Sequence, residues 1–159
     1  MKRILLLLIT LFSILIKTYC CSCIGIADFN TSIKKADVVF SARIISEERF
    51  LAYEPDESEL FFSKNAGLRI RYKVEVEEIY KGRKGKFKKV MYLVTGLGDG
   101  DCGIKLIENQ SYIIYGIYKN QFNNYTPKVH TFIYTDICTR TAIFNVNDKE
   151  EIKRIIRRW

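Results

Sequence analysis

The chain has 159 residues and a formal net charge of +8, and twenty of its residues are Tyr or Phe. This length suits one domain with a single hydrophobic core, and the abundance of aromatic residues favours β-strands. The excess of positive charge could favour an acidic glycan, a membrane surface or an acidic partner. It does not indicate a nucleic-acid partner, because no basic stripe interleaved with aromatic residues is present.

The first twenty residues have the pattern of a secretory signal peptide. A basic start at Lys2-Arg3 precedes an almost unbroken apolar run of thirteen residues, 4–16. That length is typical of the apolar region of a signal peptide. The run ends at Lys17, and it is shorter than the ~20 apolar residues that a membrane span needs. We therefore interpret residues 1–20 as a signal peptide rather than a membrane anchor.

Cleavage after Cys20 is the prediction, because Thr18 and Cys20 place small residues at the −3 and −1 positions. The mature chain would then be a single domain of residues 21–159 that begins with Cys21 and has no transmembrane segment. It would keep 23 Lys and Arg against 18 Asp and Glu. We expect a secreted or periplasmic protein, and a lipoprotein acylated at Cys20 or Cys21 is the alternative.

Four cysteines remain after this cleavage, and an exported chain folds where disulfides persist. Cys21, Cys23, Cys102 and Cys138 allow three pairings. A bridge between Cys21 and Cys23 is sterically poor across one residue, so each N-terminal cysteine is expected to pair with a distant one. Each such bridge would close a loop of about 80 residues or more, which is worth up to ~4–5 kcal/mol of chain entropy.

Short β-rich runs follow in chain order after a first helix. Residues 28–36 are expected to form this helix, capped by Asn30 or Thr31. Residues 47–66 are polar and acidic and are interpreted as a long exposed loop or an extended hairpin tip. The runs with strand patterns are residues 37–45, 68–80, 87–95, 111–118 and 125–134.

A C-terminal helix is predicted to start at a capping box formed by Asp148 and Glu151. Its apolar residues, Ile152, Ile155, Ile156 and Trp159, recur at helical spacing. Five strands with a short N-terminal helix and a C-terminal helix fit a mainly β fold, a five-stranded Greek-key barrel of the OB type.

Two local sequence patterns could indicate a chemical function and not only a structural one. Asp99-Gly100-Asp101 ends a glycine-rich loop and could be a calcium loop, but the downstream glutamate of an EF-hand is absent, so a tight turn is favoured. His130 is the only histidine, and no third group that would orient a Cys–His pair is evident. We therefore expect neither enzymatic activity nor a cofactor.

Six pieces of sequence share an order and spacing that span most of residues 21–141. Together they resemble the netrin-like domain found in the tissue inhibitors of metalloproteinases. The pieces are Cys21-Ser22-Cys23, Ala36-Asp37-Val38-Val39-Phe40, Tyr72-Lys73-Val74 running to Ile79-Tyr80-Lys81-Gly82, Cys102-Gly103-Ile104-Lys105-Leu106, Tyr112-Ile113-Ile114-Tyr115-Gly116 and Cys138-Thr139-Arg140-Thr141.

The resemblance implies an OB-type barrel with Cys21 bridged to Cys102 and Cys23 bridged to Cys138. It also implies that the amine and carbonyl of Cys21 bind the catalytic zinc of a protease, while Ser22 points into the adjoining specificity pocket. Cys21 to Cys23 would form an inhibitory wedge, and Asp101, Cys102 and Gly103 the ridge beside it.

The sequence also departs from these inhibitors, because their third disulfide and their C-terminal subdomain have no counterpart here. The leading hypothesis is a secreted, monomeric inhibitor of zinc metalloproteases. The alternative is a non-inhibitory binding module. Its basic segments, Lys81 to Lys89 and Lys153 to Arg158, would engage an anionic glycan, an envelope component or another protein.

Overall fold

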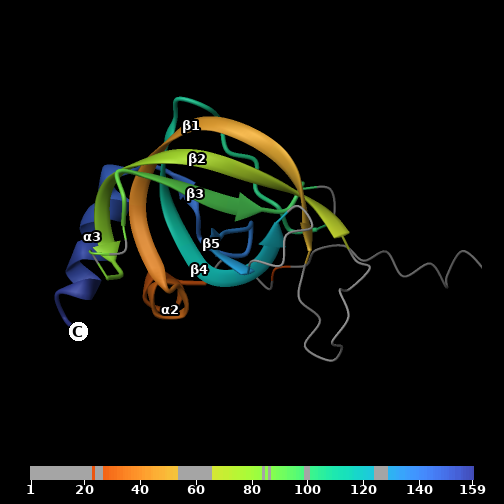
Figure 1. Ribbon diagram of the computed structural model, residues 1–159. Coiled ribbons are helices and arrows are strands. Elements are labelled where there is room, and N and C mark those ends of the chain that lie inside the picture. Colours follow the sequence, from red (N-terminus) through yellow and green to blue (C-terminus); the bar gives the residue numbers. More distant parts are fainter. Residues whose placement is uncertain are drawn as a thin grey trace, which may run out of the picture.

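The computed structural model describes residues 23, 27–53, 66–83, 85, 87–98, 101–123 and 129–159. Within these ranges the strands form a six-stranded sheet in the order β1-β2-β3-β5-β4-β6. An additional parallel pairing of β1 with β4 closes five of the strands into a barrel (Figure 1). The predicted mainly β barrel with a short first helix and a C-terminal helix is confirmed.

The helices and strands occur in the predicted order, but their lengths differ from the predicted ones. The strand β6 was not predicted, because a two-residue strand has no readable alternation. The elements are α2 Phe29–Lys35, β1 Val38–Tyr53, β2 Ala66–Lys81, β3 Val90–Thr95, β4 Ser111–Asn123, β5 Val129–Tyr134, β6 Ala142–Ile143 and α3 Val146–Ile156.

The hairpin of β1 and β2 is longer than predicted. Residues 47–53, which were expected in a long exposed loop or an extended hairpin tip, continue β1 and pair with β2 as far as Tyr53 opposite Ala66. Charged residues of this segment have cross-strand partners. Arg71, for example, donates to Glu48 at 2.6 Å. Both strands curve strongly over the barrel (Figure 1).

The barrel interior is filled by alternate residues of the strands. Val38, Phe40, Ala42 and Ile44 of β1 are fully buried in one cluster, together with Tyr72 of β2. Burying each large apolar side chain contributes roughly 1.5–3 kcal/mol. The period of two therefore fixes which face of each strand points inward.

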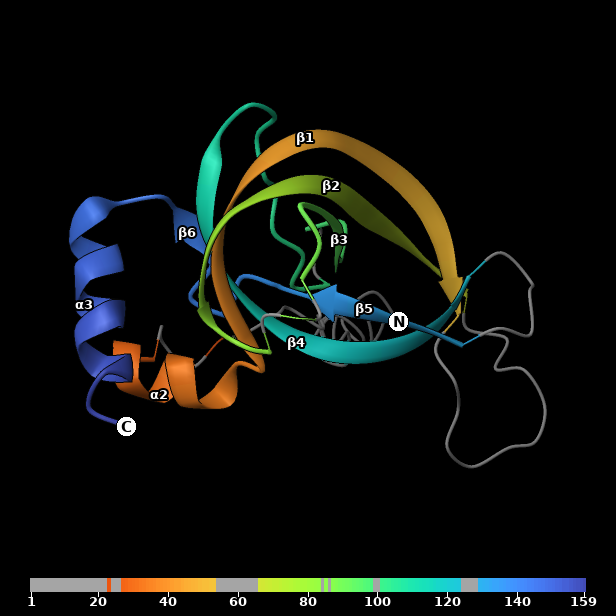
Figure 2. The ribbon, with the colours of Figure 1, turned by 60° about the vertical axis from the view of Figure 1, so that its left-hand side comes forward.

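A second core lies between the outside of the barrel and the two helices. Ile33 of α2 and Ile152 of α3 are both fully buried, and they pack with Val39, Ile113 and Tyr115. Figure 2 shows both helices on the same side of the barrel. None of the helices that the structure describes has the length and apolar character needed to traverse a lipid bilayer.

Both helix starts differ from the predicted caps. Asp28 caps α2, since its carboxylate accepts from the Thr31 amide at 3.0 Å and from the Thr31 hydroxyl at 2.7 Å. Asn145 caps α3 by accepting from the Asn147 amide at 2.8 Å, so the predicted capping box is wrong. The sequence offers several capping residues in each region, and packing of the buried helix face decides which one is used.

Candidate functional site

A disulfide joins Cys23 to Cys138, with a Cα–Cα distance of 5.3 Å across a sequence separation of 115 residues. This is the pairing that the resemblance implies for these two cysteines. Cys102 is also disulfide-bonded. Cys21 and Ser22 lie outside the described residues, so the Cys21–Cys102 bridge and the position of the wedge stay predictions.

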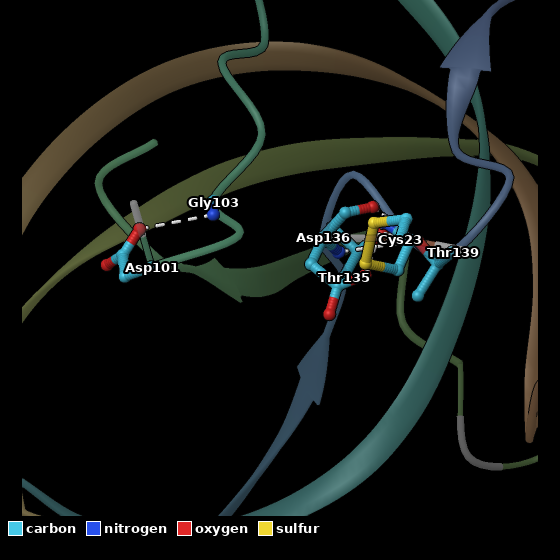
Figure 3. The surroundings of a disulfide bond; sticks show 7 residues. Cys23, Asp101, Gly103, Thr135, Asp136 and Thr139 are labelled. Carbon is cyan, nitrogen blue, oxygen red and sulfur yellow. Dashed lines mark hydrogen bonds between the residues drawn. A yellow bond between two sulfur atoms is a disulfide. The ribbon is translucent and has the colours of Figure 1, made fainter. Parts of the chain in front are cut away.

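The turn that carries Cys138 is held by hydroxyl groups. Thr135 is fully buried, and its Oγ1 lies 3.2 Å from the Tyr115 carbonyl, 2.8 Å from Thr139 Oγ1 and 2.6 Å from Thr141 Oγ1. The Cys138 amide donates to the Asp136 carboxylate at 2.9 Å. The disulfide is therefore anchored on a turn that is held by its own polar groups (Figure 3).

The segment of Asp101, Cys102 and Gly103 lies beside this disulfide. Figure 3 shows Asp101 and Gly103 on a loop next to the bridged cysteines. The Ile137 amide donates to the Cys102 carbonyl at 3.0 Å, which joins the loop directly to the turn before Cys138. The structure thus places the predicted ridge next to Cys23, although the two are far apart in sequence.

The Asp101 carboxylate is turned into its own loop. It accepts from the amides of Leu97 at 2.7 Å, Gly98 at 2.9 Å and Gly103 at 3.1 Å, and it pairs with Arg69 of β2 at 3.3 Å. Burial raises the pKa of Asp101, but these three amides and Arg69 outweigh it, and the net effect lowers the pKa. A stabilised carboxylate of this kind organises a turn.

This arrangement favours the tight-turn interpretation over the calcium loop. Asp99 and Gly100 lie outside the described residues, and the Asp101 oxygens are already used by the protein's own donors. In the part of the chain that the structure describes, no group of three or more His, Cys, Asp and Glu residues could hold a metal ion.

Two glycines, one in the ridge and one packed against it, are required by close approach. A Cβ on Gly103 would lie 2.2 Å from the carbonyl carbon and oxygen of Gly96, and a Cβ on Gly96 would lie 2.5 Å from the Asp101 carboxylate. Cys102 itself has a φ of 62°, in the left-handed region that few non-glycine residues adopt. Such backbone conformations cluster where a structure holds a segment in a defined shape for function.

Arg69 and Thr135 support this site, and neither was predicted from the sequence. Arg69 lies on β2, and nothing in its local pattern indicates a partner 32 residues away in sequence. The spacing of Thr135, Thr139 and Thr141 around Cys138 was a usable signal, because clustered hydroxyl residues commonly form local turn hydrogen bonds.

Two basic residues of α3 are paired with a carboxylate on the barrel. Lys149 and Lys153 of α3 each lie 2.8 Å from a carboxylate oxygen of Glu78 on β2, so both are partly neutralised. Hydrogen bonds from Lys149 and then Lys153 lower the pKa of Glu78. Arg154 in turn pairs with Glu151 on the same helix. Of the predicted basic segment Lys153 to Arg158, Arg157 and Arg158 are exposed and follow the end of α3.

Most of the chain matches a known protein family. A family model described as Tissue inhibitor of metalloproteinase matches residues 19–135. No curated protein matches the chain. The matched segment contains the ridge and the whole barrel through β5, and it ends shortly before Cys138. Because the match spans well over half of the sequence, the chain belongs to the tissue inhibitor of metalloproteinase family.

Proposed function

We propose that this protein is an exported inhibitor of zinc metalloproteases and that Cys21, as the mature N-terminal residue, binds the catalytic zinc. The α-amine and the carbonyl oxygen of one residue can both coordinate a metal ion, which closes a five-membered chelate ring. Catalytic zinc sites keep one position open for water or substrate. A neutral amine and a carbonyl oxygen would fill that position without presenting a scissile bond.

The observation that carries this proposal is the Cys23–Cys138 disulfide beside the ridge. Two residues of extended chain span at most about 7 Å, so a mature N-terminal Cys21 would stay within that Cα–Cα distance of Cys23. Covalent geometry would then confine its amine to the neighbourhood of the ridge. Confinement of this kind reduces the ordering cost of binding.

The ridge would then be the second contact with the protease. Its shape is fixed by the hydrogen bonds that the Leu97 and Gly103 amides donate to the Asp101 carboxylate, and by the close packing of Gly96 against Gly103. Ser22 would occupy the specificity pocket next to the zinc, and the predicted Cys21–Cys102 bridge would tie the wedge to the ridge. The protein would act by occupying the protease site, without chemistry of its own.

The decisive experiment adds one alanine before Cys21 in the mature protein. The α-amine of Cys21 then becomes an amide nitrogen, which is a poor zinc ligand. We expect the inhibition constant to rise by at least about 100-fold, since ~2.7 kcal/mol corresponds to that factor. One alanine added after Trp159 is the matched control. Unchanged inhibition by the N-terminal variant, with an unchanged melting temperature, would refute the chelation mechanism.

A second candidate function is the binding of an anionic glycan. Trp159 is 58% exposed, and the ammonium groups of Lys34 and Lys81 lie 6.0 and 5.9 Å from its ring centroid. Salt-sensitive retention on an anionic column that weakens in Lys34→Ala would support this surface. Retention that is indifferent to salt would contradict it. Lys84 and Lys86, which belong to the predicted basic segment, lie outside the described residues.

A further inference from the structure

Three segments of the sequence have the Asn-x-Ser/Thr pattern of N-linked glycosylation. They are Asn30-Thr31-Ser32, Asn109-Gln110-Ser111 and Asn124-Tyr125-Thr126. We propose that Asn109 is a glycosylation site and carries an N-linked oligosaccharide when the protein is exported through a eukaryotic secretory pathway. This inference depends on the proposed export, and it is independent of protease inhibition.

Asn109 lies on a turn that is clamped to the barrel by its backbone. Its amide donates to the Ile44 carbonyl at 2.8 Å, and the Ile44 amide donates to the Gln110 carbonyl at 3.0 Å. Asn109 has a φ of 64°, a conformation that asparagine adopts more readily than most residues. The backbone of the site is thus fixed without using the side chain.

The Asn109 side chain is exposed, and within the described ranges its side-chain carboxamide makes no hydrogen bond. The loop that precedes β4 projects beyond β1 in both ribbon views (Figures 1 and 2). Asn30, in contrast, lines a hollow of about 390 Å³ between α2 and α3 together with Arg158 and Trp159. Asn124 lies outside the described residues. Asn109 is therefore the acceptor whose surroundings favour a bulky sugar.

Exposed apolar side chains next to Asn109 give the glycan a physical role. Ile107 is 58% exposed and belongs to the same turn, where its carbonyl accepts from the Gln110 amide at 3.3 Å. Ile45, which follows the clamped Ile44, is 37% exposed. A hydrophilic oligosaccharide on Asn109 would cover this apolar surface and reduce self-association.

The modification itself needs a glycosyl donor, which is a lipid-pyrophosphate-linked oligosaccharide of the secretory pathway. Nδ2 of Asn109 forms a bond to C1 of the first sugar, and the bond between C1 and the pyrophosphate oxygen breaks. The amide nitrogen loses one proton, and the lipid pyrophosphate leaves with the bonding electron pair. No oxidant or reductant is required.

The test is peptide mapping by mass spectrometry of the full chain secreted from eukaryotic cells. We expect a glycopeptide that contains Asn109. Enzymatic removal of the sugar by an amidase should leave this peptide with the mass change of Asn109→Asp. Ser111→Ala should abolish the modification and Ser111→Thr should restore it, because either hydroxyl completes the motif. Asn147→Gln, outside any such motif, is the control and should leave the glycan in place.

Two outcomes of this experiment distinguish failure of the glycosylation proposal from failure of the proposed export. If the chain reaches the medium with Asn109 unmodified, the glycosylation proposal is wrong and the proposed export stands. If the chain is retained inside cells with its own leader, the proposed export is wrong. A second leader of established secretory function, fused at Cys21, then still tests Asn109, and an unmodified Asn109 in that secreted material overturns the site.

Discussion

Replacing Asp101 by asparagine tests whether one carboxylate organises the ridge. One oxygen of Asp101 accepts from Gly98 and Gly103, and the other accepts from Leu97 and pairs with Arg69. Asparagine keeps only one acceptor oxygen. If that oxygen serves the two glycine amides, the NH₂ group of the new side chain faces the donors of Leu97 and Arg69.

The expected loss follows from the contacts that Asp101→Asn removes. A hydrogen bond to a charged group contributes about 1.5–3 kcal/mol. The Asp101 side chain is 31% exposed, so solvent screens the pair with Arg69 and favours the lower part of that range. We expect the free energy of unfolding to fall by about 2 kcal/mol, which corresponds to a shift of roughly 1 M in the urea midpoint.

The loss should depend on pH in a defined direction. The folded-state pKa of Asp101 is lowered from its usual value of 3.8, so its stabilisation is present above the unfolded pKa and disappears as the pH falls through the folded pKa. The difference between wild type and Asp101→Asn should be constant from about pH 7 to 5 and shrink below about pH 4.

Urea denaturation of the oxidised protein at several pH values measures this difference. Glu150→Gln is the matched control, because it removes the same charge from an exposed position of α3. The control should change the unfolding free energy by less than about 0.5 kcal/mol. Equal stability of Asp101→Asn and wild type at neutral pH, or a deficit that does not shrink in acid, would refute the role assigned to the carboxylate.

Three further substitutions test the surroundings of the site. Gly103→Ala should cost about 3 kcal/mol in urea denaturation, because its Cβ would overlap the Gly96 backbone; full stability would mean that the ridge is loosely packed. Thr135→Val should lower the calorimetric stability by about 1–3 kcal/mol, because the hydroxyl bonded to Tyr115 and two threonines is lost, and Thr135→Ser should recover most of it. Lys81→Met removes an ammonium that donates to the carbonyls of Ile33, Lys34 and Ala36. Amide exchange in α2 should therefore accelerate by about 10-fold, equivalent to ~1.4 kcal/mol of local stability, and unchanged exchange would contradict this capping role.

Much of the fold could be predicted because the barrel depends on local alternation. The inward positions of β1, such as Phe40 and Ile44, follow from a period of two, and Ile152 is buried where helical spacing places it. Element ends were less predictable. The hairpin extends through residues 47–53 because its charges pair across strands, and such partners are not visible in one strand alone.

For the candidate site, too, some features follow from the local sequence pattern and others depend on long-range contacts. The sequence alone identified the cysteines, the glycine-rich loop and the resemblance that links them to a family of protease inhibitors. Only the tertiary structure placed the Cys102 carbonyl against the Ile137 amide, turned Asp101 into its own loop and brought Arg69 to it. The physical reason is that covalent and periodic constraints act over a few residues. Contacts between distant segments, in contrast, depend on how the closed barrel brings strands and loops together in space.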